Sequence, residues 1–94
     1  MDEDGTRAVE QQRKRLRFRS WHRGTREMDL LLGGFADARL QAMTPTQLDR
    51  YEALLELGDP DLYAWISGRE APPPAHDTDV LQQLRNFKID PVHD

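Results

Sequence analysis

Glycines and prolines divide this chain into five short segments, and each segment carries apolar residues at helical spacing. The clearest example is Met28, Leu31, Leu32 and Phe35, which repeat at i, i+3, i+4 and i+7 and place one apolar stripe along a helix. Valine, isoleucine and threonine never alternate with polar residues as a half-buried strand requires. The sequence therefore predicts an all-α fold, a compact five-helix antiparallel bundle with short loops.

The same glycines and prolines predict where the helices begin and end. We expect helices over about residues 8–22, 25–41, 44–58, 59–68 and 78–87. Thr44 should cap the third helix together with Gln47, and Asp59 should cap the fourth ahead of Pro60. Together the helices would form a single domain over residues 8–89, between a flexible acidic N-terminus at residues 1–7 and a flexible tail at residues 90–94.

Two glycines interrupt the second expected helix. Gly33 and Gly34 should cost about 2 kcal/mol relative to two alanines, so they need a structural reason. The pair predicts a close helix crossing or a bend, and we favour either over a ligand-binding role.

Several functional classes are disfavoured by what the chain lacks. It has no cysteine, so it forms no disulfide and no thiolate metal site. The longest apolar run, residues 28–32, is far shorter than the roughly 20 residues that span a bilayer, and the start of the chain resembles neither a secretory signal nor a transit peptide. We expect a cytoplasmic protein that does not bind membranes.

Charge is distributed very unevenly along the chain. Residues 13–26, here called the basic run, hold seven bases and no acid, whereas residues 1–12 carry a net −3 and residues 27–94 a net −8. The basic run consists of Arg13, Lys14, Arg15, Arg17, Arg19, Arg23 and Arg26, interleaved with Phe18 and Trp21. Such a segment could grip phosphates and stack bases, which makes a nucleic-acid-binding or antitoxin-like regulator the alternative function. The acidic remainder would repel a polyanion, and the two aromatic residues also fit a helix face packed on the core.

No residue pattern indicates catalysis. Ser20 and Ser67 lie in no nucleophile elbow, and no glycine-rich phosphate loop follows a strand. His76, Asp77 and Asp79 cluster, but their spacing matches no zinc or calcium site, so we interpret them as a solvated turn beside a helix cap. The sequence predicts no catalytic residue, no metal site and no enzyme activity.

Two motifs carry a resemblance to a known family. Residues 23–29, Arg-Gly-Thr-Arg-Glu-Met-Asp, resemble the Arg-Gly-x-x-Glu-x-Asp signature of the succinate dehydrogenase FAD assembly factors, the SdhE-type flavinators. Residues 54–65 resemble the family's later pattern, with Leu-Glu at 55–56, Asp-Pro-Asp-Leu at 59–62 and Trp65. The resemblance covers roughly residues 10–89.

The resemblance implies a five-helix protein that binds the flavoprotein subunit of succinate dehydrogenase, and in bacteria often that of fumarate reductase. Such a factor promotes covalent attachment of FAD to a histidine of that subunit. The sequence has no nucleotide-binding motif, so we expect the chain to bind no cofactor tightly itself and the partner to hold FAD. On this interpretation, nucleic acid is not among its partners.

The motif also implies which residues bind the partner. The signature falls on Arg23, Gly24, Glu27 and Asp29, and we add the neighbouring Arg19 and Trp21 as candidates. Gly24 would adopt a left-handed turn, and Arg23 would offer a planar fork to partner oxygens. Glu27 and Asp29 would accept partner hydrogen bonds, unless they serve only the helix N-terminus. Trp21 fits an interface anchor and a core position equally well.

Overall fold

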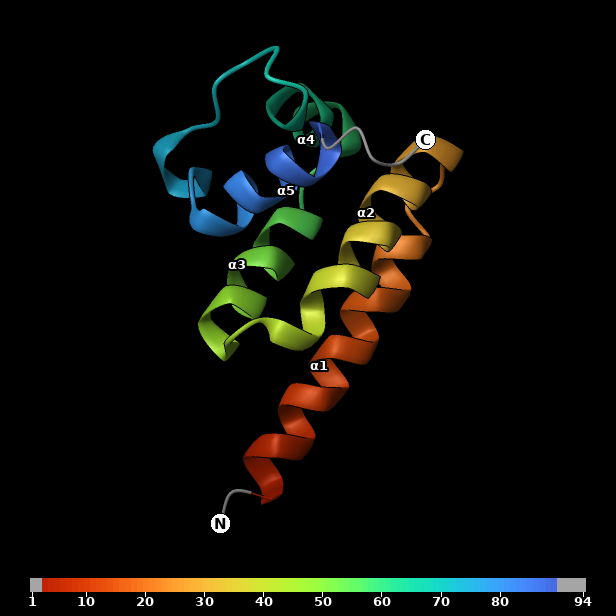
Figure 1. Cartoon of the computed structure of the whole chain (residues 1–94), viewed down its shortest axis with the longest axis vertical. Helices are drawn as coiled ribbons and strands as arrows, with labels where there is room; N and C mark the ends of the chain where they lie inside the picture. Colours follow the sequence, from red (N-terminus) through yellow and green to blue (C-terminus); the bar gives the residue numbers. More distant parts are fainter. Residues whose placement is uncertain (1–2, 90–94) are drawn as a thin grey trace. The chain divides into compact units, whose positions relative to one another are not determined.

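The computed structural model of this chain describes residues 3–89, where it shows five α-helices and no β-strand (Figure 1). The helices are α1 (Glu3–Trp21), α2 (Arg26–Arg39), α3 (Pro45–Leu55), α4 (Asp59–Ile66) and α5 (Asp79–Ile89). Two short 3-10 helices, η1 (Leu40–Ala42) and η2 (Pro74–His76), follow α2 and precede α5. The all-α class and the five helices predicted from the sequence are confirmed. Within residues 3–89, no helix is long and apolar enough to cross a membrane.

The first helix begins earlier than expected. α1 starts at Glu3 and not near residue 8, so residues 3–7 of the acidic N-terminal segment are helical. Gly5 and Thr6 are weak helix formers, but extending an existing helix adds one backbone hydrogen bond for each residue ordered. The flexibility of this segment stays a prediction. Residues 1–2 and 90–94 of the two expected flexible ends lie outside the described residues.

The chain consists of two compact units, Met1–Asp49 and Arg50–Asp94. In the first unit, α1 and α2 pack side by side and run antiparallel (Figure 1). Leu16 from α1 and Leu32 and Phe35 from α2 are completely buried, and burial of each such side chain stabilises the fold by about 1.5–3 kcal/mol. In the second unit, α4 packs against α5. The expected single domain over residues 8–89 stays a prediction.

Local hydrogen bonds set the helix starts. At α3, the Thr44 hydroxyl accepts from the Gln47 backbone N–H (3.2 Å), and the Gln47 side chain accepts from the Thr44 N–H (3.0 Å), so the predicted capping box is confirmed. The predicted cap of α4 is wrong. Gly58 occupies the cap position with extended backbone, which places Asp59 and Pro60 inside the first turn. At this position the negative charge of Asp59 still interacts favourably with the positive N-terminal end of the helix dipole.

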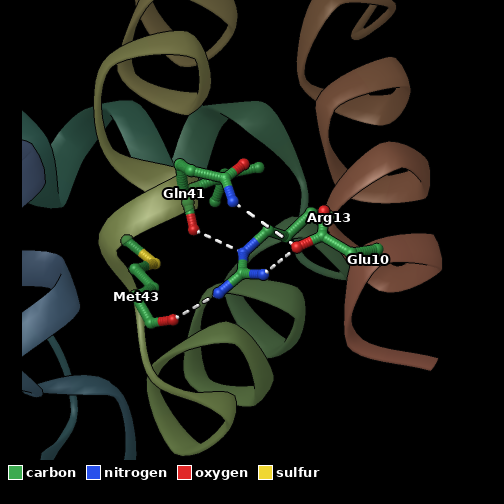
Figure 2. Close-up of polar contacts among 5 residues, drawn as sticks. Glu10, Arg13, Gln41 and Met43 are labelled. Carbon is green, nitrogen blue, oxygen red and sulfur yellow. Dashed lines mark hydrogen bonds and ion pairs between the residues drawn. The ribbon is translucent and has the colours of Figure 1, made fainter. Parts of the chain in front are cut away.

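Arg13 bonds to the backbone just beyond the carbonyl end of α2 (Figure 2). Its Nε donates to the Leu40 carbonyl (2.9 Å) and its Nη2 to the Met43 carbonyl (2.9 Å). Its Nη1 pairs with the Glu10 carboxylate at 2.6 Å, and that carboxylate also accepts from Gln41 at 3.4 Å. The last carbonyls of a helix have no partner within it, and a guanidinium satisfies such groups well. Arg13, only 13% exposed, therefore ties α1 to the segment after α2.

We expect Arg13→Ala to lower the free energy of unfolding by about 1.5–3 kcal/mol, since the carbonyls of Leu40 and Met43 lose a charged donor. Urea unfolding followed by circular dichroism measures the change. Lys14→Ala, at the exposed position next to it, is the control and should change stability by less than about 0.5 kcal/mol. Equal effects of the two substitutions would show that the carbonyl contacts contribute nothing.

Candidate functional site

A four-residue turn, residues 22–25, joins α1 to α2 and carries Arg23 and Gly24 of the predicted partner-binding motif, while Glu27 and Asp29 follow in the first turn of α2. Gly24 lies at its centre with φ +117°, a conformation that side-chain-bearing residues rarely adopt. A Cβ built on Gly24 would meet no atom within 4 Å. The turn therefore requires glycine for its backbone conformation and not for packing, as the sequence predicted, and the space over it is open.

Asp29 holds this turn in place from the first turn of α2. Its Oδ1 accepts from the backbone N–H of Arg23 (2.6 Å) and from that of Gly24 (3.2 Å). Thr25 caps the same helix, because its hydroxyl accepts from the Met28 N–H at 3.3 Å. Asp29 thus has an intramolecular function that neither sequence interpretation included, since it acts on the turn and not only on the helix end.

Trp21 fixes the other side of the turn. A Cβ built on Gly33 would lie 2.2–2.6 Å from three atoms of the Trp21 ring, so the indole lies directly on the α2 backbone. Of the two explanations predicted for the glycines, a close crossing or a bend, the structure shows a close approach at Gly33, where the Trp21 ring of α1 contacts the α2 backbone. The Trp21 Nε1 reaches the Asp37 carboxylate at 3.4 Å, and that oxygen also faces Arg17 Nε at 3.4 Å. Trp21 is partly exposed, so it combines packing with an accessible edge.

The remaining candidates differ in exposure. Glu27 is exposed at the second position of α2, and its side chain forms no hydrogen bond or ion pair with any residue of the described range 3–89. Arg23 and Arg19 are partly exposed, the first in the turn and the second in the last turn of α1. All six predicted residues therefore lie in or next to one turn. Their binding of a partner stays a prediction.

Phe18 is not part of the core. The sequence suggested that it could pack on the core with Trp21, but Phe18 is 63% exposed and stacks on His22, with ring centroids 3.9 Å apart. The buried face of α1 instead carries Leu16 and Ser20, whose hydroxyl donates to the Leu16 carbonyl at 2.7 Å. A position two residues from Leu16 points away from that face, because successive helical residues are about 100° apart.

The turn lines one part of a surface depression. The depression is lined by Trp21, His22, Gly24, Arg26, Asp29 and Leu30, among others. Leu30, which sequence reasoning assigned to no site, is 53% exposed at its edge. An exposed leucine on an otherwise amphipathic helix is the signal that could have identified it.

Residues 76–79, predicted to form a solvated turn before α5, interact with neighbouring side chains. The His76 ring stacks on Trp65 with centroids 5.6 Å apart, Asp77 accepts from Gln82 at 3.1 Å, and Asp79 pairs with Arg50 at 2.9 Å. Over residues 3–89, no group of three histidine or carboxylate side chains is placed to hold a metal ion.

Comparison with known proteins decides the family. A family model described as "Flavinator of succinate dehydrogenase" matches residues 14–88, which include the whole turn and both resembling motifs. The chain belongs to this flavinator family. The resemblance recognised in the two motifs is confirmed.

Three curated relatives agree with the family model. The FAD assembly factor SdhE of Acetobacter pasteurianus is 43% identical over 72 residues, which are 77% of this chain and 66% of the relative. The mitochondrial succinate dehydrogenase assembly factor 2 of Dictyostelium discoideum is 39% identical over 85 residues, 89% of this chain and 60% of the relative. The mitochondrial succinate dehydrogenase assembly factor 2 of Candida glabrata is 38% identical over 84 residues, which are 85% of this chain and 55% of the relative. The flavinator chain thus spans between about half and two thirds of these relatives' lengths.

We expect Asp29→Ala to accelerate hydrogen exchange at the backbone amides of Arg23 and Gly24, because both donate to the lost carboxylate. Amide exchange measured by NMR reports each position separately. Glu27→Ala is the control and should leave both rates unchanged, since Glu27 contacts neither amide. Equal acceleration by the two variants would mean that a general loosening of α2, and not Asp29, controls the turn.

We expect Gly33→Ala to lower the free energy of unfolding by about 1–3 kcal/mol, because the added methyl group overlaps the Trp21 ring. Gly5→Ala is a matched control, since this helical glycine has no atom within 4 Å of its added Cβ and should gain about 0.5–1 kcal/mol. In a Trp21→Ala background, Gly33→Ala should lose its penalty. A penalty that persists there would refute the contact as its cause.

Proposed function

We propose that this protein binds the flavoprotein subunit of succinate dehydrogenase, and in bacteria also that of fumarate reductase, and promotes covalent attachment of FAD to a histidine of that subunit. The observation that carries the proposal is that the family match contains a surface Arg-Gly-x-x-Glu-x-Asp motif, whose turn is held by two hydrogen bonds to Asp29. Its relatives are named FAD assembly factor and succinate dehydrogenase assembly factor, and those names support the same role here.

The motif residues divide into two groups in this proposal. Gly24 and Asp29 shape the turn, while Arg23 and Glu27 contact the partner. A turn that is already ordered loses little conformational entropy on binding, which favours affinity. Arg23 offers a planar fork for a carboxylate or for carbonyl groups, and Glu27 accepts from partner donors.

The chain catalyses no step itself in this proposal. The flavoprotein holds FAD and supplies the reacting histidine, and the factor stabilises the conformation in which the two meet. Holding two reacting groups in position can lower a barrier by several kcal/mol. We further propose that the chain binds no cofactor tightly and that it acts in the cytoplasm.

Covalent flavin on the flavoprotein subunit tests the proposal. The subunit is expressed alone, with the wild-type chain, or with the double variant Arg23→Ala, Glu27→Ala, and flavin fluorescence is read in denaturing gels. We expect fluorescence to require the wild-type chain and to fall by roughly tenfold with the variant, as a loss of about 1.4 kcal/mol in binding would produce.

A matched control removes one arginine and one glutamate outside the motif. Arg69→Ala, Glu70→Ala changes two exposed neighbours by the same charges and should support full flavin attachment. Equal fluorescence with and without the wild-type chain would overturn the proposed function. The basic run would then be tested for oligonucleotide binding that weakens steeply with salt.

A further inference from the structure

Exposed apolar side chains gather beside the Gly24 turn. Phe18 and Leu30 are 63% and 53% exposed, and no other large apolar side chain of the described residues is exposed to this degree. His22 stacks on Phe18 and, with Leu30, lines the depression that contains Gly24. We call Phe18, His22 and Leu30 the apolar rim. Apolar groups that surround a depression and remain in water are typical of a binding surface.

Positive charge lies next to the apolar rim. Lys14 and Arg15 are exposed and lie one turn before Phe18 on the same face of α1. Arg26 is exposed and lines the depression itself. No acid occurs within the basic run, and the first-turn carboxylate of Asp29 already accepts two backbone hydrogen bonds. A surface that docks here gains most if it carries carboxylates.

We infer that the apolar rim and these cations form the docking site for an acidic segment of a protein partner, which inserts an apolar side chain between His22 and Leu30. The segment's carboxylates lie against Lys14, Arg15 and Arg26, while its donors reach the exposed Glu27. The inference rests on the proposed function, because it takes the flavoprotein subunit as the partner that supplies the segment.

Two observations favour a protein segment over nucleic acid. Leu30 is aliphatic, so one of the three side chains of the apolar rim offers no flat face on which a base could stack, and the other two, Phe18 and His22, already stack on each other. The Arg13 guanidinium donates to the Leu40 carbonyl and is only 13% exposed, and Arg17 pairs with Asp37. The seven bases of the basic run therefore do not form one continuous phosphate-binding surface in the folded protein.

Binding of the chain to flavoprotein subunit purified without covalent flavin tests the inference. We expect Leu30→Asp and Phe18→Ala each to raise Kd by about tenfold or more, the effect typical of an interface anchor. Ala42→Asp places the same new charge at an exposed position beyond the far end of α2 and should change Kd by less than about twofold. Leu30→Ala removes the side chain without adding charge and should follow Leu30→Asp. Circular dichroism melting establishes that every variant is folded.

A kinetic measurement tests the acidic character of the segment. Rising salt should slow association of the wild-type chain. The double variant Lys14→Gln, Arg15→Gln should associate more slowly with little change in the dissociation rate. Arg69→Gln, an exposed arginine outside the basic run, is the control and should leave association unchanged.

Four outcomes would overturn the inference. The first is equal Kd for the Leu30, Phe18 and Ala42 variants, and the second is association that is insensitive to salt and to Lys14→Gln, Arg15→Gln. The third is that the apolar-rim substitutions weaken binding of a labelled oligonucleotide but not binding of the flavoprotein subunit. The fourth is a dimer, seen by sedimentation, that Leu30→Asp disrupts while flavoprotein binding persists. In each case the proposed function still stands if covalent flavin requires the wild-type chain, so the two failures are distinguishable.

Discussion

The indole of Trp21 lies on the backbone of Gly33, and the geometry of the first unit depends on that contact. Any side chain at residue 33 would overlap the ring, so the packing of Trp21 from α1 on the backbone of α2 requires glycine there. The chain then has four residues, 22–25, in which to reverse direction. Gly24 adopts the left-handed conformation that this reversal needs, and Asp29 closes the turn with two backbone hydrogen bonds. The packing of α1 on α2 and the conformation of the turn in the motif therefore depend on each other.

That coupling explains why the Arg-Gly-x-x-Glu-x-Asp motif contains a residue, Asp29, whose carboxylate bonds to its own chain. A turn presents side chains reproducibly only when its own backbone is satisfied, since an unpaired N–H would favour other conformations. Asp29 meets this requirement for Arg23 and Gly24, whereas Glu27 remains exposed. The motif thus combines a turn that Asp29 holds by hydrogen bonds with the exposed carboxylate of Glu27.

The basic run divides in a similar way. Arg13 satisfies the carbonyls that follow α2, and Arg17 pairs with Asp37 on α2, so both hold the two helices of the first unit together. Lys14 and Arg15 are exposed beside Phe18. Seven like charges in one segment therefore do not form one electrostatic surface, because the helix directs successive side chains to different sides. The fold therefore determines which of these charges are largely buried, as Arg13 is, and which are exposed, as Lys14 is.

Local interactions explain what could be predicted from the sequence. The capping box at Thr44 and the stripe through Met28 and Phe35 join residues within two turns of each other, so spacing alone identifies them. The motif, and with it the family, is also local. Arg13 meets carbonyls 27 and 30 residues away, and the exposure of Phe18 depends on which face of α1 meets α2. Those features required the tertiary structure, because contacts between distant residues depend on how the helices cross and not on the order of residues in either helix.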